Sequence, residues 1–374
     1  MTNDRAPLII PDRLKPRDGR FGSGPSRVPV EALEALAAPG SVMGTSHRQA
    51  PVKSLVARLQ ENLAALYRLP DGYQVVLGNG GSNVFWDIAV CCLIEHRSAH
   101  GAWGEFGRKF VDAVAAAPFL GEPVSYAAPF GQAATMVSAD GVDVYAWPQN
   151  ETSTGVCAPV QRVGGAHDGA LMLIDATSSA GGMDADISQT DAYYFAPQKN
   201  FASDGGLWAA FCSPAALERS ARLTAQRWVP PMLNLTVAAE NSALHQTLNT
   251  PALATLALFD HQLTWLLENG GMAFAEARTQ ASSGALYAWA EAKPFVRPFV
   301  ADPAQRSPVV ATLQFDESVD AKALTSVMRA NGIVDIEPYR SAGPNQIRVG
   351  CYAAVDPSDV DALIECLDWT IEHL

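Results

Sequence analysis

The chain has 374 residues, 48% of them hydrophobic and 17% charged, which is enough apolar material for a globular protein of about two domains. Its net charge of -13, from 26 Lys and Arg against 39 Asp and Glu, disfavours a general binder of nucleic acid or of anionic membranes. No signal-peptide pattern and no apolar run of membrane-spanning length is present, so we expect a cytoplasmic protein.

The first part of the chain alternates helical and strand patterns. Apolar residues at three-to-four spacing predict helices over 31–38 and 51–69. A short buried strand at 74–78, the loop GNGGSN and a buried helix at 84–94 follow. Four more apolar segments are predicted strands, with helical or irregular segments between them: 142–147, 170–176, 192–197 and 207–213. This alternation indicates an α/β domain with a mostly parallel sheet.

The pattern changes near Thr250. Thr250 is a predicted N-cap, Pro251 a predicted first helical residue, and the helix should continue to Gly270. A compact unit of strands and helices is predicted beyond it: strands in 309–317, 332–337 and 346–352, a helix over 320–332, and a last helix capped by Asp356. We therefore expect a large domain over 16–268 and a small domain over 269–374, with 1–15 packed on the small one.

The cysteines and histidines do not form metal-binding patterns. The six cysteines show no C-x-x-C spacing, and the seven histidines include no H-E-x-x-H pair. We expect reduced, mostly buried thiols and no metal site.

Two charged residues follow buried apolar segments. Lys199 comes after YYFAP, and Asp175 ends LMLID 24 residues earlier, each at the carboxyl end of a predicted parallel strand. Ligands of open α/β sheets bind at that edge. Pyridoxal 5'-phosphate (PLP) requires such a pair, because a lysine holds its aldehyde and a carboxylate keeps its ring nitrogen protonated. Strand-end Asp and Lys are common, however, so the pair alone does not decide the function.

The loop GNGGSN has the chemistry of a phosphate site. It places backbone N–H groups at the start of a helix, with Ser82 and Asn83 as further donors. It lacks the Lys of a Walker loop and the third glycine of a dinucleotide loop. A plain turn is the alternative for this loop taken alone.

In this order, GGSN, Asn150-Glu151-Thr152, IDATSSAGG and APQKN resemble the phosphoserine aminotransferases, PLP-dependent enzymes of the class V aminotransferase group. FGSGPS, GTSHRQAPV, QTLNTP and NQIRVGCY extend the resemblance over nearly the whole chain. It implies the fold of the PLP-dependent transferases of fold type I. In that fold a large domain with a mostly parallel, seven-stranded sheet carries a smaller C-terminal α/β domain.

The resemblance also implies roles for single residues. Lys199 would form the Schiff base with PLP and carry the proton between substrate and cofactor carbons, and Asp175 would contact the pyridine nitrogen. Phe106 would stack on the ring. The other implied cofactor residues are Gly81, Ser82, Asn83, Thr152 and Gln198, together with Asn249 and Thr250 from the second subunit of a homodimer.

Four basic residues would bind substrate. Arg348 matches the family's arginine for the α-carboxylate, His47 and Arg48 match the pair for the distal anionic group, and Arg340 would assist there. The chain departs from the commoner pattern at Asn83, Phe106 and Tyr339, where many members carry Arg, Trp and His. These departures bear on substrate affinity more than on reaction type.

The implied reaction moves an amino group between L-glutamate and 3-phosphohydroxypyruvate, giving 2-oxoglutarate and O-phospho-L-serine for serine biosynthesis. The resemblance also allows the four-carbon phosphorylated substrate of pyridoxine biosynthesis. One alternative is a small-substrate class V aminotransferase of the alanine–glyoxylate type, which would need fewer cations. Another is a non-catalytic PLP-binding regulator, although no basic helical extension is present. A cysteine desulfurase is disfavoured because no cysteine lies between Cys212 and Cys351.

Overall fold

The computed structural model describes residues 8–38, 40–340, 343 and 345–374. Within these ranges the helices are α1 (Val30–Ala37), α2 (Ala50–Leu66), α3 (Ser82–Cys92), α4 (Glu105–Ala115), α5 (Pro214–Gln226), α6 (Leu235–Ala243), α7 (Leu253–Glu268), α8 (Gly271–Ala292), α9 (Ala321–Ala330) and α10 (Pro357–His373). Short 3-10 helices occupy Asp12–Leu14, Ile187–Gln189, Pro231–Leu233 and Pro303–Gln305.

A seven-stranded sheet forms the centre of the molecule, in the order β1-β9-β8-β7-β4-β2-β3. Its strands are β1 (Gln74–Asn79), β2 (Ser98–Ala102), β3 (Val124–Ala127), β4 (Val144–Pro148), β7 (Leu171–Asp175), β8 (Ala192–Phe195) and β9 (Leu207–Cys212). Only β9 runs antiparallel to its neighbours, β1 and β8. The expectation of a mostly parallel sheet in an α/β fold is therefore confirmed.

Two of these strands, β2 and β3, lie in segments that the sequence pattern predicts to be helical or irregular. β2 has the sequence SAHGA, with small residues and a histidine in place of β-branched ones, although all five residues are buried. β3 is four residues long and only half-buried. Both pair in parallel, with each other and, for β2, with β4, so their extended form comes from neighbouring strands more than from intrinsic preference.

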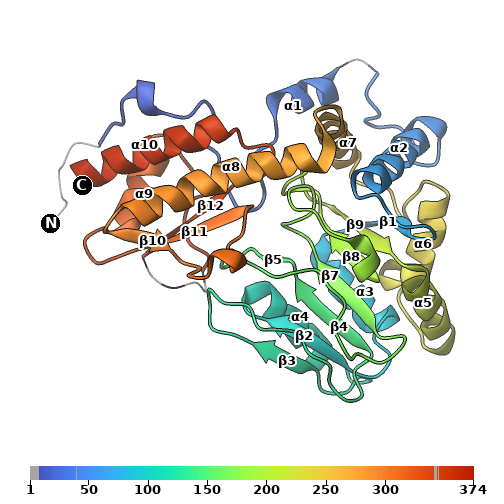
Figure 1. Cartoon of the computed structure of the whole chain (residues 1–374). Coiled ribbons are helices and arrows are strands. Elements are labelled where there is room, and N and C mark those ends of the chain that lie inside the picture. The colour runs from blue at the N-terminus through green and yellow to red at the C-terminus, as the bar shows by residue number, and fades with distance from the viewer. Residues whose placement is uncertain (1–7, 39, 341–342, 344) are drawn as a thin grey trace.

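Alternate side chains of the strands feed two cores, one on each face of the sheet. On one face, residues such as Val144 and Leu173 pack against α3 to α6. On the other, residues such as Tyr145 and Ile174 pack against α2 and α7. Because successive side chains point to opposite faces and helices cover both faces, the central strands are apolar throughout their length (Figure 1).

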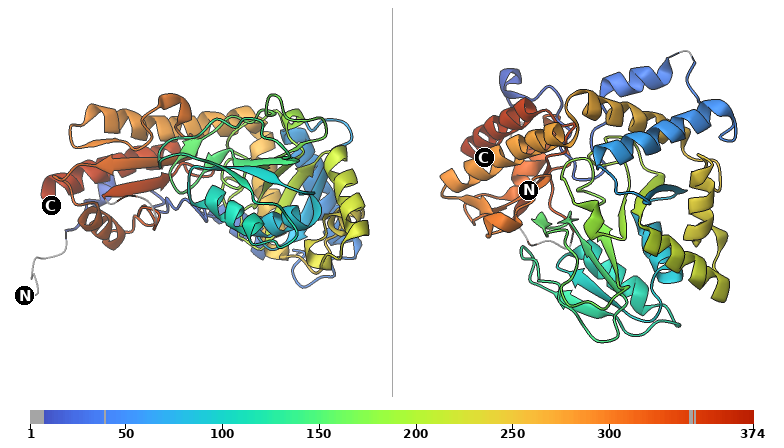
Figure 2. Two further views of the ribbon diagram at one scale, coloured as in Figure 1. Left: turned by 90° about the horizontal axis from the view of Figure 1, so that it is seen from below. Right: turned by 45° about the vertical axis from the view of Figure 1, so that its right-hand side comes forward.

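The C-terminal part forms a second unit with its own core. β10 (Val296–Pro298), β11 (Val310–Phe315) and β12 (Gln346–Gly350) make an antiparallel sheet that packs with α8, α9 and α10. Helix α8 extends from the end of α7 into this unit, as the views in Figures 1 and 2 show. A separate two-stranded ribbon, β5 (Asn150–Glu151) and β6 (Val156–Cys157), lies in the first part of the chain.

The described N-terminal residues also belong to this second core. Ile10 and Phe21 are fully buried in it, and the Ile10 N–H donates to Asn331 Oδ1 at 2.9 Å. Residues 1–7 of the predicted N-terminal segment lie outside the described ranges. The predicted boundary at 268/269 falls between α7 and α8, and it stays a prediction.

Two local predictions are wrong, whereas the predicted cap of the last helix is confirmed. The long helix begins at Leu253 with Ala252 as N-cap, and Thr250 Oγ1 instead lies 3.3 Å from His47 Nδ1. The segment 332–337 is no strand, because Asp335 has a φ of 66° and Val334 makes only one isolated bridge, to Arg20. Asp356 caps α10 as predicted, and its side chain accepts the Ser358 N–H.

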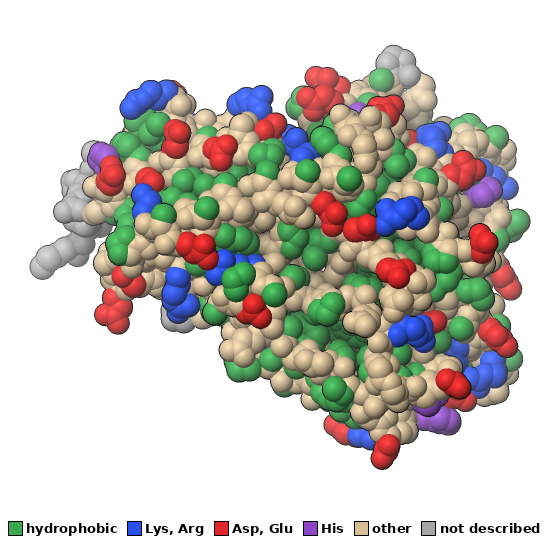
Figure 3. All heavy atoms as spheres, in the orientation of Figure 1, with side chains coloured by type: hydrophobic (Ala, Val, Ile, Leu, Met, Phe, Trp, Pro, Cys, Tyr) green, Lys and Arg blue, Asp and Glu red, His purple; other side chains and the backbone are tan. Residues whose placement is uncertain are grey.

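The described helices include none that is both long and apolar enough to cross a membrane. On the face shown in Figure 3, basic and acidic side chains are interspersed. The excess of acidic residues is therefore not gathered into one patch on this face.

Candidate active site

A cavity of about 310 Å³ opens at the carboxyl ends of the parallel strands β4, β7 and β8. The starts of α3 and α4 complete its wall. It is lined by Gly24, Pro25, Gly81, Ser82, Asn83, Trp86, Phe106, Pro148, Asn150, Thr152, Asp175, Thr177, Gln198 and Lys199. The structure therefore brings together every predicted cofactor residue except Asn249 and Thr250.

Lys199 is buried in this cavity, with only 7% of its surface exposed. Its Nζ donates to Thr152 Oγ1 at 3.1 Å and lies 5.5 Å from the centroid of the Phe106 ring. The pKa of Lys199 is lowered to about 8, chiefly by burial and also by the nearby Arg348 charge, while Asp175 and Glu151 oppose the shift. A lysine of this kind is partly neutral near physiological pH, which is the form that attacks a carbonyl carbon.

Space for the Lys199 side chain depends on Gly24, in the FGSGPS segment. A Cβ on Gly24 would lie 2.8 Å from Lys199 Cε, and the φ of Gly24 is +146°, which side chains rarely adopt. Glycine at this position keeps the lysine inside the cavity. The segment thus has a local role that its sequence did not reveal.

Asp175 ends β7 and faces the cavity with its carboxylate held on both oxygens. Oδ1 accepts the backbone N–H of Thr177 at 2.9 Å and its hydroxyl at 2.5 Å. Oδ2 accepts the indole N–H of Trp86 at 3.3 Å. Because both oxygens accept hydrogen bonds, the carboxylate has a fixed orientation at the cavity wall, where it can face a cationic ring nitrogen.

The start of α3 forms the anion-binding end of the cavity. Gly81 is the N-cap of α3, and nothing lies within 4 Å of the place where its Cβ would be. Ser82 Oγ and Gln198 Oε1 are buried and have no hydrogen-bond partner. Orphaned buried polar groups are rare in folded proteins, and beside a helix N-terminus the Ser82 hydroxyl can donate to a bound phosphate. Gln198 would donate through its amide nitrogen, because its Oε1 only accepts.

Glu151 fixes the start of α4, which carries Phe106. This fully buried carboxylate accepts the N–H groups of Phe106 and Gly107, each at 3.1 Å, and the Ser153 hydroxyl at 2.6 Å. Burial raises the pKa of Glu151, and these hydrogen bonds counteract the rise. Glu151 thereby fixes the backbone of Phe106, and this backbone places the ring at the cavity wall.

Arg348 reaches the same site from β12. Its Nη1 donates to the Thr152 carbonyl oxygen at 2.8 Å, and its Cζ lies 5.2 Å from the Tyr339 ring centroid. Its Nε is buried without a partner. Burial lowers the pKa of Arg348. A donor thus remains free beside Lys199, as a carboxylate-binding arginine requires.

The remaining predicted residues lie elsewhere on this protomer and do not line the cavity. His47 Nδ1 is 3.3 Å from Thr250 Oγ1, and Arg48 Nη1 donates to Gln246 Oε1 at 2.7 Å. Asn249 contacts Asn79 with its backbone N–H at 3.4 Å. Arg340 is exposed and adjoins residues outside the described ranges. One protomer therefore does not bring the predicted distal anion site to Lys199.

Sequence reasoning missed several cavity residues. Trp86 lies inside an apolar helix, where its sequence context indicates a core residue, and Thr177 lies in the ATSSAGG segment, to which the resemblance assigns no single role. Asn150 likewise has no assigned role, although its Nδ2 donates to Ser178 Oγ at 2.7 Å. A pattern of polar residues just after strand ends was the available signal for Asn150 and Thr177.

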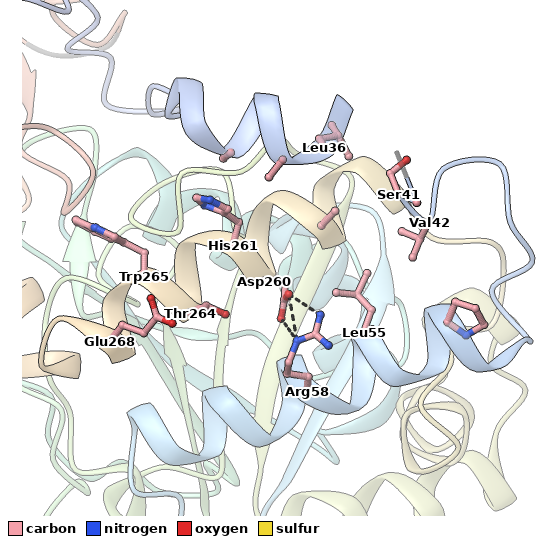
Figure 4. A pocket seen from close by; sticks show the side chains of 15 residues that line it. Leu36, Ser41, Val42, Leu55, Arg58, Asp260, His261, Thr264, Trp265 and Glu268 are labelled. Carbon is pink, nitrogen blue, oxygen red and sulfur yellow. Dashed lines mark hydrogen bonds and ion pairs between the residues drawn. The ribbon is translucent and has the colours of Figure 1, made fainter. Parts of the chain in front are cut away.

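A second hollow, of about 460 Å³, lies between α1, α2 and α7 (Figure 4). Its arginine, Arg58, is already paired with Asp260 at 2.7 Å, and His261, Thr264 and Glu268 also line it. None of the predicted site residues lines this hollow. The Lys199 cavity is therefore the candidate active site.

Comparison with known proteins agrees with this geometry. The family model described as "Aminotransferase class-V" matches residues 37–363. A Mycolicibacterium vanbaalenii protein named as a candidate phosphoserine aminotransferase is 58% identical over 368 residues, which are 98% of this chain and 99% of that protein. The phosphoserine aminotransferase of a Nocardioides species is 54% identical over 370 residues, covering 98% of this chain and 99% of that protein.

A solved structure shows the same fold at lower sequence identity. The phosphoserine aminotransferase of Bacillus circulans subsp. alkalophilus has a TM-score of 0.85 and 20% identity, covering 96% of this chain and 99% of that chain. Together with the family match, these similarities show that the chain belongs to the class V aminotransferases, a family of PLP-dependent enzymes.

Proposed function

We propose that this enzyme binds PLP in the Lys199 cavity and transfers an amino group between L-glutamate and 3-phosphohydroxypyruvate. The products are 2-oxoglutarate and O-phospho-L-serine, as in a step of serine biosynthesis. One observation carries the proposal: a buried lysine with a lowered pKa shares a cavity with a multiply hydrogen-bonded aspartate and an orphaned anion-binding end. The substrate follows from the names of relatives more than 50% identical over almost the whole chain.

The residues present fit the cofactor. Ser82, Asn83 and Gln198 would hold its phosphate together with the free N–H groups of the first turn of α3. Asp175 would hold the pyridine nitrogen and Phe106 would cover one face of the ring, since both line the cavity.

When bound, the cofactor supplies a ring that accepts the electron pair released at the substrate α-carbon. The chain's residues do the remaining work. Lys199 Nζ holds the aldehyde and moves a proton, Thr152 Oγ1 orients that amine, and Arg348 binds the α-carboxylate. The buried setting of Lys199 excludes water from the proton transfer.

We also propose that two copies of the chain share their sites. Arg48, Asn249 and Thr250 are exposed on the isolated protomer, although the family resemblance assigns them to ligands. The surface near them carries unusually exposed apolar side chains. Met232 is 42% exposed and accepts a hydrogen bond from Asn249, and Trp228 and Leu244 are 85% and 61% exposed. A second copy would cover this apolar surface and receive the polar residues.

Hybrid dimers test the shared sites. We expect Lys199→Ala and Thr250→Ala chains to be nearly inactive alone and to regain activity when mixed under exchanging conditions. The reason is that one site of each hybrid then contains both native residues. The measurement is the rate of O-phosphoserine formation, with a mixture of Lys199→Ala and wild-type chains as the exchange control. No regain in a mixture shown by mass spectrometry to contain hybrids would contradict the proposal.

Arg48 should discriminate between phosphorylated and unphosphorylated acceptors. Losing one charge-assisted hydrogen bond costs about 1.5–3 kcal/mol, so we expect Arg48→Ala to lower kcat/KM for 3-phosphohydroxypyruvate by on the order of tenfold to a hundredfold. The value for hydroxypyruvate, which lacks the phosphate, should change little. Arg58→Ala, which breaks the pair with Asp260 outside the cavity, is the matched control. Equal losses for both acceptors would favour the small-substrate alternative.

The assignment as a whole is tested with purified enzyme, PLP and glutamate. Formation of 2-oxoglutarate and O-phosphoserine should require 3-phosphohydroxypyruvate. A preference for alanine and glyoxylate would identify a small-substrate transaminase, and cofactor binding without turnover would identify a regulator. Turnover of the four-carbon phosphorylated analogue would add the pyridoxine pathway.

A further inference from the structure

We propose that Trp86 is a positioning residue: its indole N–H, which the Tyr194 hydroxyl also holds in place, keeps the Asp175 carboxylate in the orientation that meets the pyridine nitrogen. This inference rests on the proposed PLP function. Neither residue entered the family resemblance. The tertiary structure places both beside Asp175.

The contacts come from two different elements. Trp86 lies in the second turn of α3, and its Nε1 is 3.3 Å from Asp175 Oδ2 and 3.0 Å from the Tyr194 hydroxyl. Tyr194 lies on β8, where it pairs directly with Asp175 of β7, and its hydroxyl accepts the same indole N–H. The indole N–H of Trp86 thus links helix α3, whose start forms the anion-binding end, to the neighbouring strands β7 and β8.

Aromatic packing leaves these two side chains little freedom to turn. The Trp86 ring stacks on Phe110 of α4, with 5.8 Å between centroids and 14° between planes. The Tyr194 ring stacks on Phe85, at 4.4 Å and 16°. Trp86 is 5% exposed and Tyr194 is 1% exposed. The donors are therefore preorganised before a cofactor arrives, which avoids reorganisation during the reaction.

The two carboxylate oxygens are held separately. Thr177 donates twice to Oδ1, and Trp86 donates to Oδ2 from the other side. Without the Trp86 N–H, the carboxylate is held only at Oδ1, by Thr177, and it can rotate about that atom away from the cavity. A carboxylate that is free to rotate stabilises a cationic ring nitrogen less well.

Two titratable groups beside Asp175, Tyr194 and His100, keep a constant charge at neutral pH. Burial raises the pKa of Tyr194 far above its usual range, and the Asp175 charge adds to this. Burial lowers the pKa of His100, which lines a small cavity behind Asp175, to about 3. Glu151 and Arg348 flank Lys199, whose pKa is about 8. A change in the pH midpoint of the enzyme's visible absorbance then reports on the bond between Lys199 and the cofactor and on the charge of the cofactor ring.

The test is Trp86→Phe, which keeps an aromatic ring against Phe110 and removes the N–H. In this variant Asp175 would stabilise the positive charge on the ring nitrogen less well. A ring with less positive charge repels the proton on the Lys199 nitrogen less, so that nitrogen holds its proton more tightly. The pH midpoint of the visible absorbance of the enzyme with bound PLP should therefore rise, by about half a pH unit or more. The single-turnover rate with saturating glutamate should fall on the order of tenfold, with KM for glutamate changed by less than about threefold.

Trp289→Phe is the matched control, because Trp289 Nε1 also donates to a carboxylate, that of Asp368, at 2.9 Å in the C-terminal unit. It should leave the spectral midpoint unchanged. Tyr194→Phe, which removes a single hydroxyl, guards against misfolding of Trp86→Phe and should move the midpoint in the same direction. If wild type binds PLP and both variants keep the wild-type midpoint and rate, the inference is wrong. If wild type binds no PLP, the proposed function itself fails.

Discussion

Lys199→Ala should abolish steady-state transamination while leaving the protein able to bind PLP without a covalent bond. The alanine lacks both the amine that holds the aldehyde and the group that moves the proton, whereas the anion-binding end around Ser82 and the Asp175 carboxylate are untouched. We expect a fall in turnover by several orders of magnitude, with cofactor retention seen after gel filtration. Loss of both cofactor and fold would be detected by circular dichroism.

Lys109 is the matched control for this prediction. Its Nζ lies 5.7 Å from the Phe106 ring centroid, close to the 5.5 Å of Lys199, but its side chain is 44% exposed and paired with Glu105. The Glu105 contact raises the pKa of Lys109. Borohydride reduction followed by peptide mapping should label Lys199 and leave Lys109 free. A label on any other lysine would overturn the site assignment.

The pKa of Lys199 sets the pH dependence of this covalent attachment. With a pKa of about 8, about a tenth of the amine is neutral at pH 7, against roughly 3 in 10,000 for an ordinary lysine. Only the neutral amine attacks the aldehyde, so the rate at which apoenzyme binds PLP covalently should rise with pH and level off above about 8. Stopped-flow absorbance measures this rate, and a rise that continues past pH 10 would contradict the lowered pKa.

Asp175→Asn is expected to have the second largest effect. The amide keeps the shape and several hydrogen bonds of the carboxylate but carries no negative charge, so it cannot stabilise a protonated ring nitrogen. We expect the single-turnover rate with glutamate to fall by about 10²–10³-fold, while the affinity for PLP falls much less. The two quantities separate a catalytic charge from a merely structural residue.

Asp191→Asn provides the control for Asp175→Asn. Asp191 is also a buried acid beside a strand, and its Oδ2 accepts the Met172 N–H at 2.8 Å and an Arg162 N–H at 2.9 Å. It precedes β8 and therefore lies at the amino ends of the parallel strands, whereas the cavity lies at their carboxyl ends. Its replacement should reduce stability without a specific loss of rate. A wild-type rate in Asp175→Asn would mean that Asp175 only ends a strand.

The sequence by itself determined the features that are written locally. Apolar segments that end in Asp175 and precede Lys199 predicted two parallel strands with reactive ends, and β7 and β8 confirm the strands and their parallel direction. The glycine-rich loop predicted a helix start, which α3 confirms at Ser82. These features depend on backbone preferences and on the burial of contiguous residues, so a short window of sequence carries them.

Only the tertiary structure decided which distant side chains meet. Gly24 makes room for Lys199, Glu151 caps the helix that presents Phe106, and Trp86 reaches Asp175, which lies 89 residues further along the chain. The same holds for β2, whose small residues become a strand because β3 and β4 pair with it on either side. Such contacts depend on how elements pack rather than on the local preference of any one of them, and a periodic pattern in the sequence records only which face of an element is buried, not what lies against it.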